Sequence, residues 1–478
     1  MTSPARLRPF GATTIKRLLT DERGGREVAL IDLREAGYSE LCYLDGGVSG
    51  WGRAGFELFS GVNVPSKAFG EFIEHAAETP SISALDLDAL LRKKTDMVIV
   101  DSRPFAEYHR VSIPTATNVP GAELVYRIHD VAPSPDTMVV VNCAGRTRSI
   151  ISAQSLINAG IPNQVMALRN GTMGWSLDGL DCESGKDKLA PQLSDEGLAI
   201  AKAAAARIAE KAGIERITRE QLDAFRAEPN CTLYLFDVRD PSEYETGHVA
   251  GALSAPGGQL VQATDQYVGT VGARIVLIDD AEVRAVMTAS WLRQMGWREV
   301  FILVEKGEET GMPAPAVLST SADPELQIDI ATLNELLPVG EIAVIDLALS
   351  PTYRKGHIPG AWFAIRARLR EALTKLPRPG GFALTSEDGV LASLAAPELS
   401  KLTDIPVRAL TGGNAAWKAA GLPFEETPHM ADDPIDVWLK PYERTGNTRG
   451  AMSEYLNWET DLLPRIERDG TTNFQRLV

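Results

Sequence analysis

The fold is decided by a short apolar run that ends in an aspartate, Met97-Val-Ile-Val-Asp101-Ser-Arg103. The same pattern occurs at three other places in the chain. These are Val28-Ala-Leu-Ile-Asp32-Leu-Arg34, Leu233-Tyr-Leu-Phe-Asp237-Val-Arg239 and Ile342-Ala-Val-Ile-Asp346-Leu-Ala348. A brief, continuous apolar run of this kind is typical of a buried strand in a parallel sheet. The chain therefore contains an internal repeat, and each copy begins with such a strand.

A glycine-rich turn that leads into a tryptophan closes three of the four copies. The turns are Gly46-Gly-Val-Ser-Gly-Trp51, Asn170-Gly-Thr-Met-Gly-Trp175 and Gly412-Gly-Asn-Ala-Ala-Trp417. The third copy has only Val304-Glu-Lys-Gly307 at this place. Strands and amphipathic helices alternate between the two signatures. We therefore predict an α/β protein of tandem domains, each a small doubly wound parallel sheet flanked by helices.

The spacing within the copies divides the chain. Only 19 residues separate Asp32 from Trp51, against 74 between Asp101 and Trp175, so the first copy is truncated. At about 150 residues per domain, a chain of 478 residues has room for about three full domains. The predicted parts are a truncated unit (1–65), a full domain (78–182), a helical linker (183–213), a full domain (214–308), a linker (309–323), a full domain (324–426) and a partly helical tail (427–478).

Composition excludes several classes of partner. Lys and Arg number 48 against 64 Asp and Glu, which gives a net charge of −16. An acidic chain lacks the cationic field that drives binding to nucleic acid or anionic lipid, so we expect neither partner. The chain contains no run of 18 apolar residues, so we expect no membrane span. The sequence leaves a homodimer open.

The four cysteines are Cys42, Cys143, Cys182 and Cys231. They form no CxxC pair and no zinc-type spacing, so we expect no disulfide scaffold, no metal and no cofactor. Such sparse cysteines fit a reducing compartment, and we predict a cytoplasmic location.

One of these cysteines lies where it can do chemistry. Cys143-Ala-Gly-Arg-Thr-Arg-Ser149 connects a buried strand to a helix. Backbone N–H groups of such a loop, the positive end of the helix dipole, and the cations Arg146 and Arg148 all favour an anion at the Cys143 sulfur. Gly145 lets the backbone curl around that sulfur. A thiolate, rather than a thiol, is the nucleophile.

The second copy resembles the rhodanese family of sulfurtransferases. The resemblance rests on Asp101 with Arg103, Glu107-Tyr108, Pro114 with Asn118-Val-Pro120, the cysteine loop and the turn before Trp175. The third copy adds Asp237 to Gly247-His248-Val-Ala-Gly-Ala252, and the fourth adds Tyr353-Arg-Lys-Gly-His357-Ile-Pro-Gly-Ala361. The resemblance covers roughly Val28 to Pro423, as three full copies and a fragment. One departure is Arg146 at the fourth position of the loop, where the commoner loop has glycine.

The resemblance implies transfer of sulfane sulfur from a donor such as thiosulfate to a thiol or cyanide, through a persulfide on Cys143. The implied cradle for that sulfur is formed by Ala144, Gly145, Arg146, Thr147, Arg148 and Ser149. Arg146 or Arg148 would bind the oxyanion of the donor. Asp101 and Arg103 are expected to support the site by pinning the strand end rather than to react.

Two other functions stay open at this stage. Asp279 and Ser386 replace the nucleophile in the third and fourth copies, and these copies are predicted to be inactive. With one nucleophile in four copies, a non-catalytic sulfur-binding or scaffold protein is an alternative. A cysteine phosphatase or arsenate reductase could share the architecture. A phosphatase loop, however, places Arg six residues after Cys, where this chain has Ser149.

Overall fold

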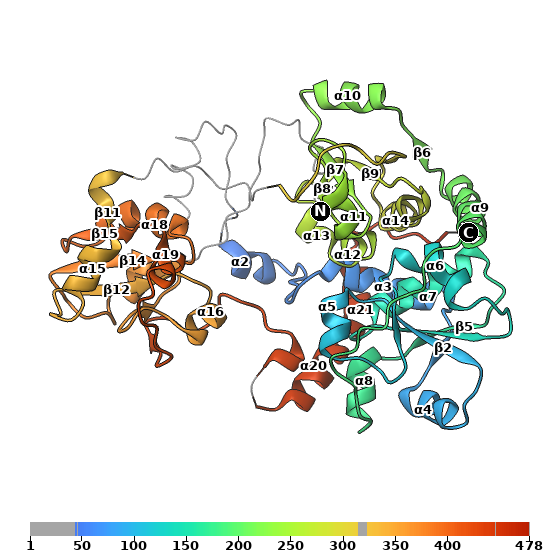
Figure 1. The fold of residues 1–478 in the computed structure, drawn as a ribbon, viewed down its shortest axis with the longest axis horizontal. Coiled ribbons are helices and arrows are strands. Elements are labelled where there is room, and N and C mark those ends of the chain that lie inside the picture. The colour runs from blue at the N-terminus through green and yellow to red at the C-terminus, as the bar shows by residue number, and fades with distance from the viewer. Residues whose placement is uncertain (1–43, 45, 314–322, 445, 478) are drawn as a thin grey trace. The chain divides into compact units, whose positions relative to one another are not determined.

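A computed structural model of the chain describes residue 44 and residues 46–313, 323–444 and 446–477 (Figure 1). The chain divides after Pro313 and after Lys440 into two compact units. The first unit holds the sheets of the second and third copies and the last helices of the chain, and the second unit holds the sheet of the fourth copy. The strand predicted to end at Asp32, and Cys42, lie outside the described residues.

The second copy forms a five-stranded parallel sheet in the order β1-β5-β4-β2-β3. Its strands are β1 (Ser81–Ile82), β2 (Met97–Asp101), β3 (Thr117–Asn118), β4 (Met138–Asn142) and β5 (Val165–Leu168). Its helices are α4 (Ala84–Arg92), α5 (Phe105–Arg110), α6 (Glu123–Val131), α7 (Thr147–Ala159) and α8 (Gly171–Leu177). Asp101 at the end of β2 is in register with Asn142 at the end of β4. The predicted strand end and the cysteine loop after β4 therefore share one edge of the sheet.

The third copy repeats this sheet in the order β6-β10-β9-β7-β8. Its strands are β6 (Glu215–Arg216), β7 (Leu233–Asp237), β8 (Leu253–Ser254), β9 (Arg274–Ile278) and β10 (Val300–Leu303). Its helices are α10 (Arg219–Ala227), α11 (Pro241–Thr246), α12 (Gly257–Gln262), α13 (Thr264–Tyr267) and α14 (Val283–Gln294). Asp237 is in register with Ile278, so Asp279 begins the loop that corresponds to the cysteine loop.

The fourth copy adds a strand to the same plan, in the order β11-β15-β14-β12-β13-β16. Its strands are β11 (Gln327–Ile328), β12 (Ile342–Asp346), β13 (Trp362–Phe363), β14 (Gly381–Thr385), β15 (Val407–Leu410) and β16 (His429–Met430). Its helices are α15 (Ile330–Leu336), α16 (Ser350–Lys355), α17 (Leu369–Ala372), α18 (Val390–Ser400) and α19 (Gly413–Ala419). Asp346 pairs with Thr385, which places Ser386 at the start of the corresponding loop.

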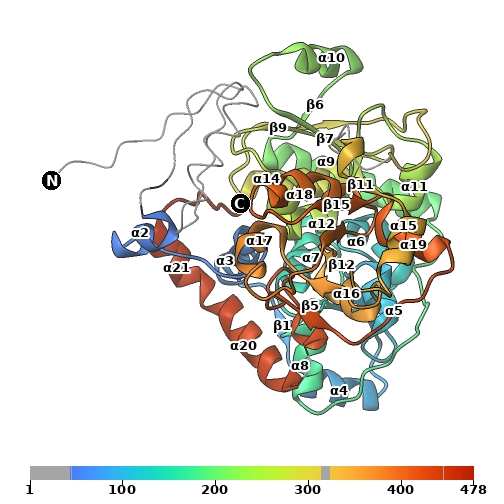
Figure 2. The same ribbon diagram turned by 90° about the vertical axis from the view of Figure 1, so that its left-hand side faces the viewer.

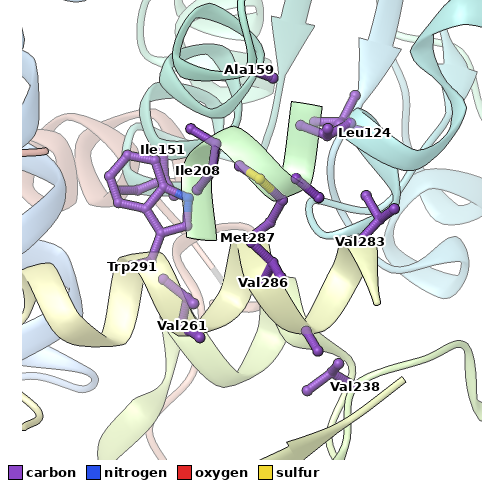
Figure 3. Packing of buried hydrophobic residues seen from close by; sticks show 14 of the residues in the cluster. Leu124, Ile151, Ala159, Ile208, Val238, Val261, Val283, Val286, Met287 and Trp291 are labelled. Carbon is purple, nitrogen blue, oxygen red and sulfur yellow. The ribbon is translucent and has the colours of Figure 1, made fainter. Parts of the chain in front are cut away.

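The second and third copies share one hydrophobic core. Helix α9 (Asp195–Ala212) lies between the two copies in sequence and packs against α6, α7 and α14. Figure 3 shows Ile151, Ile208 and Met287, which come from α7, α9 and α14, close to one another. Trp291 on α14 donates from its indole nitrogen to Ser155 on α7 at 2.8 Å. The segment predicted as a linker therefore contains a helix that is part of this core.

The two ends of the first unit meet on one face. Helix α3 (Val64–Ala77) packs against α7, and the C-terminal helices α20 (Thr448–Thr460) and α21 (Leu462–Asp469) pack against α3. Figures 1 and 2 both place α20 beside α8, in agreement with their contacts. Buried Ala68, Leu462 and Ile466 form a small core of their own between α3 and α21.

The glycine–tryptophan turns form one recurring element. Helices α8, α19 and α2 (Gly47–Arg53) each follow a residue with a positive φ, at 61° for Asn170, 72° for Gly412 and 70° for Gly46. In each helix the tryptophan nitrogen donates to a carbonyl six residues later, at 2.9 to 3.0 Å. These three tryptophans are Trp51, Trp175 and Trp417.

The predicted fold class is confirmed: in the described residues, three parallel sheets flanked by helices follow one another along the chain. The predicted domain limits stay predictions, and β16 lies beyond the predicted limit at residue 426. Within the ranges that the structure describes, no helix is long and apolar enough to cross a membrane.

Candidate active site

Cys143 directly follows the last residue of β4 and opens the loop that leads into α7. Only 2% of its surface is exposed. The thiol lies 3.5 Å from the hydroxyl oxygen of Ser149, and that hydroxyl donates to the carbonyl of Arg146 at 2.9 Å. The two ends of the predicted loop are therefore in contact across its interior.

The turn before Trp175 holds the carbonyls of this loop. The amides of Thr172 and Met173 donate to the carbonyls of Cys143 and Ala144 at 2.9 and 3.0 Å. A Cβ at Gly171 would lie 2.3 Å from the Cys143 oxygen, so only glycine permits this approach. The glycine–tryptophan turn thus completes the structure of the loop. Its amides bind the loop carbonyls and leave the loop N–H groups unused.

Those N–H groups have no carbonyl partner. Within the described residues, none of the backbone N–H groups from Ala144 to Ser149 donates to a backbone carbonyl. The first turn of α7 contributes three of them, together with the positive end of its helix dipole. An anion at the Cys143 sulfur would satisfy donors that the protein itself does not satisfy.

Arg148 is the loop cation that interacts electrostatically with the Cys143 sulfur. It donates to both carboxylate oxygens of Glu107, at 3.1 and 2.8 Å, and to the side chain of Gln259 at 3.2 Å. Burial opposes its charge, but Glu107 and then the Cys143 sulfur outweigh burial and raise the pKa of Arg148 above its ordinary value. The guanidinium therefore stays charged and within electrostatic reach of the thiol.

Arg146 is engaged by α3 instead. Its guanidinium donates to both oxygens of Glu71 at 2.7 Å, to Glu74, and to Asn170 at 3.1 Å. Desolvation raises the pKa of Glu71, although Arg146 opposes this shift. A donor anion would have to compete with these carboxylates for Arg146, and with Glu107 for Arg148. The predicted binding of the oxyanion by either arginine stays a prediction.

The C-terminal helix α20 covers the loop. An oxygen of Glu459 lies 3.1 Å from the position that a Cβ on Gly145 would take, and Leu456 lies 3.6 Å from it. The other Glu459 oxygen accepts from Lys67 at 2.6 Å and from Tyr455 at 3.1 Å. The oxygen that faces Gly145, Oε2, is buried and has no hydrogen-bond partner among the described residues. A fully buried carboxylate thus approaches the loop from the far end of the chain.

The predicted supporting residues pin the strand end. Asp101 and Arg103 are both buried, and their side chains form two hydrogen bonds, at 2.8 and 2.7 Å. Asp101 also accepts from Asn142, and Arg103 donates to the carbonyl of Val111 at 2.6 Å. Asp237 and Arg239 repeat this pair in the third copy. The recurrence of the pair in a copy whose loop has no cysteine favours the structural role.

In the third copy, a carboxylate occupies the corresponding loop. Asp279 accepts from the backbone N–H groups of Ala281, Arg284 and Ala285, at 3.1, 2.8 and 3.3 Å. The Arg284 side chain donates to the same carboxylate at 2.9 Å and is itself fully buried. The fourth copy has only a weak version, in which the Ser386 hydroxyl accepts from Ala392 at 3.3 Å. Neither loop contains a nucleophilic sulfur.

The two loops of the first unit are related by an approximate twofold arrangement of contacts. Arg148 and Arg284 each lie five residues after the first loop residue, and each binds the glutamate of its own copy, Glu107 or Glu243. Each also reaches the other copy, because Arg148 binds Gln259 and Arg284 binds Glu123 at 3.0 Å. Gln259 and Glu123 both lie 22 residues after the aspartate of their copy. The third copy therefore contributes a residue to the surroundings of the cysteine loop.

Sequence reasoning missed the residues that surround the loop from outside the copy. They are Lys67, Glu71 and Glu74 on α3 and Tyr455 and Glu459 on α20. Gly70 offers one usable signal, since a Cβ there would lie 2.9 Å from Thr147 and a glycine inside an amphipathic helix indicates close packing. Nothing in the sequence around Glu459 indicates its partner.

Comparisons with known proteins agree with this arrangement. A model of the rhodanese-like domain matches residues 83–178 and 218–307. The crystal structure of thiosulfate sulfurtransferase from Pseudomonas aeruginosa is 45% identical in sequence, covers 98% of this chain and 89% of that chain, and has a TM-score of 0.92. The match thus extends over almost the whole length of both chains.

Curated relatives match over a shorter range. The centrosomal protein of 41 kDa from Gallus gallus is 31% identical over 100 residues, which cover 19% of this chain and 27% of the relative. The human protein of the same name is 29% identical over 119 residues, which cover 23% of this chain and 30% of the relative. The chain therefore spans less than a third of the length of these two relatives. The near full-length match to the Pseudomonas aeruginosa structure, together with the two matches of the domain model, shows that the chain belongs to the rhodanese-like family of sulfurtransferases.

Proposed function

We propose that this protein transfers sulfane sulfur from thiosulfate to a thiol or cyanide through a persulfide on Cys143. The observation that carries the proposal is the loop itself, in which a buried thiol begins a segment whose N–H groups have no carbonyl partner among the described residues. A persulfide sulfur is a single anionic atom, and it matches a small ring of such donors.

In the first step, the Cys143 thiolate attacks the outer sulfur of thiosulfate. A sulfur–sulfur bond forms at Cys143, the sulfur–sulfur bond of the donor breaks, and sulfite leaves with the electron pair. In the second step, cyanide attacks the outer persulfide sulfur, thiocyanate leaves, and the Cys143 thiolate returns. A thiol acceptor would instead carry the sulfur away as its own persulfide.

The surrounding residues have distinct parts in this proposal. The N–H groups from Ala144 to Ser149 stabilise the charge on the transferred sulfur, and Arg148 adds a fixed positive charge. The Ser149 hydroxyl accepts a hydrogen bond from the thiol at 3.5 Å and so orients it. Arg146 holds the loop against α3, because Glu71 binds it through two parallel hydrogen bonds.

The experiment is a thiosulfate–cyanide assay of purified variants. Cys143→Ala should lose transfer to the uncatalysed background, whereas the matched variant Cys182→Ala should keep it, because Cys182 contacts Ser176 and not the loop. Full activity of Cys143→Ala would overturn the proposal, and so would turnover of an aryl phosphate by the unchanged protein.

Three further parts of the proposal concern the whole chain. We propose that residues 1–65 are a truncated copy, which α2 supports because it repeats the tryptophan contact of α8 and α19. A cytoplasmic location is supported by the free thiols of Cys143, Cys182 and Cys231. A homodimer would be tested by sedimentation of the full chain.

A further inference from the structure

A pocket lies in the first unit, away from the cysteine loop. Three segments form it: the end of α9, the end of α14 with the residues that follow, and the C-terminal stretch from Asn473 to Leu477. Its volume is about 440 Å³, which is in the range of small-molecule sites. Figure 1 shows the C-terminal end of the chain beside α9.

The pocket is strongly cationic within an acidic protein. Lys211, Arg293, Arg298 and Arg476 line it, and no aspartate or glutamate does. None of the four forms an ion pair within the described part of the chain. Glu299, which follows Arg298 in the sequence, binds Arg274 instead at 2.9 Å.

Helix ends account for only part of this charge. Lys211 and Arg293 lie in the last turns of α9 and α14, where a cation complements the helix dipole. Two helix ends supply about one negative charge together, so about three of the four positive charges remain uncompensated. Arg298 and Arg476 lie outside both helices.

The pocket also holds a donor without a partner. The Nε of Arg293 is buried and donates to nothing among the described residues. The rest of this guanidinium makes one long contact, at 3.5 Å, to the carbonyl of Val300. A buried guanidinium N–H group without a hydrogen bond costs free energy, and an anion in the pocket would accept that hydrogen bond.

We propose that this pocket binds a small organic phosphate that carries at least two negative charges and a planar ring. The cations match a diphosphate, and the half-buried Trp297 in the lining offers a face on which a ring can stack. The net charge of −16 repels large polyanions, so a small molecule that senses only the local field is favoured.

The test is calorimetric titration of the full chain with pyrophosphate, with adenosine diphosphate and with adenosine. Both phosphates should bind, binding should weaken with added salt, and the nucleotide should bind more tightly than pyrophosphate. Adenosine alone should not bind. The double variant Lys211→Gln with Arg298→Gln should weaken binding of both phosphates about tenfold.

The matched control is Lys202→Gln with Arg408→Gln, which removes the same charge from exposed positions outside the pocket. It should leave binding within about twofold of the unchanged protein. The proposal is overturned if neither phosphate binds, if the control loses as much affinity as the double variant, or if adenosine binds as tightly as the diphosphate. A single-stranded oligonucleotide that binds more tightly than the nucleotide would also overturn it.

Discussion

The loops that begin at Cys143 and Asp279 are built on the same plan, but only the Asp279 loop begins with its own carboxylate. Each follows the strand beside the repeat aspartate, and each carries an arginine five residues later. In the third copy, the Asp279 carboxylate accepts three N–H groups of its own loop, and Arg284 neutralises it. In the second copy, the first loop residue is a cysteine rather than a carboxylate, and Arg148 binds the Glu107 carboxylate.

This difference teaches how one cradle serves two purposes. Where a side chain of the loop is the anion, the loop becomes a buried brace that ties the two copies together through Arg284 and Glu123. Where the loop residue is a cysteine, the proposed function assigns the same donors to the anion that forms on its sulfur. The predictions below exchange or remove the parts of each loop in turn.

The largest effect is expected when the second loop is given the residue of the third. Cys143→Asp should abolish sulfur transfer, while the protein keeps its fold, because the loop amides and Arg148 can hold a carboxylate as Arg284 does. Transfer assays and thermal unfolding measure the two results. A variant that unfolds would break the comparison, since it would mean that the second loop cannot accept an internal anion.

Removing the anion from the third loop should cost stability. Asp279→Ala leaves the fully buried Arg284 without its central partner, and breaking a buried pair of this kind costs about 3 kcal/mol. Urea unfolding of the full chain measures the loss. Asp280→Ala is the control, because its partly exposed carboxylate contacts the same arginine at 3.2 Å and should cost less than about 1 kcal/mol. Equal losses would contradict the role of the buried carboxylate.

A smaller effect is expected from Arg148. Arg148→Gln should slow formation of the persulfide about tenfold, because a positive charge near the sulfur is lost. Arg148→Lys keeps the charge and should recover most of the rate. Stopped-flow measurement of sulfite release over a range of pH separates the effect of the Arg148 charge on the sulfur from the role of Arg148 in holding Glu107. If both variants lose the same rate, Arg148 acts only by holding Glu107.

The smallest effect concerns the repeat aspartate itself. Asp346 in the fourth copy has no arginine partner among the described residues, because Ala348 stands where the second and third copies have Arg103 and Arg239. Burial raises the pKa of Asp346 to about 6 from an ordinary 3.8. The folded state therefore binds this proton more tightly than the unfolded state. Its contribution to stability is largest below pH 4 and falls as the pH rises to about 6.

Asp346→Asn should remove this fall. Urea unfolding of the full chain at a series of pH values from 4 to 8, by a signal from the second unit, measures it. An unchanged pH dependence in the variant would show that another group is responsible.

Local features of the chain could be predicted from the sequence. The apolar runs became β2, β7 and β12 because a buried parallel strand is written in consecutive residues. The place of Cys143 and the pinning pair of Asp101 and Arg103 followed from the same register, since both lie at one strand edge.

Contacts between distant segments could not be predicted. Lys67 and Glu459 are 392 residues apart, and they meet only because α3 and α20 pack together over the loop. Helix α9 was recognised as a helix, but its place in a core shared by two copies depends on packing that no local pattern encodes. The partners of Arg146 and Arg148 were missed for the same reason.

The central claim is that Cys143 carries the transferred sulfur. Mass spectrometry of the full chain after treatment with thiosulfate, followed by digestion, tests it most directly. We predict one added sulfur, about 32 Da, on the peptide that contains Cys143 and on no peptide of the third or fourth copy. Cyanide should remove it. No added mass on that peptide, or the same mass on the peptide of Cys182 or Cys231, would contradict the account.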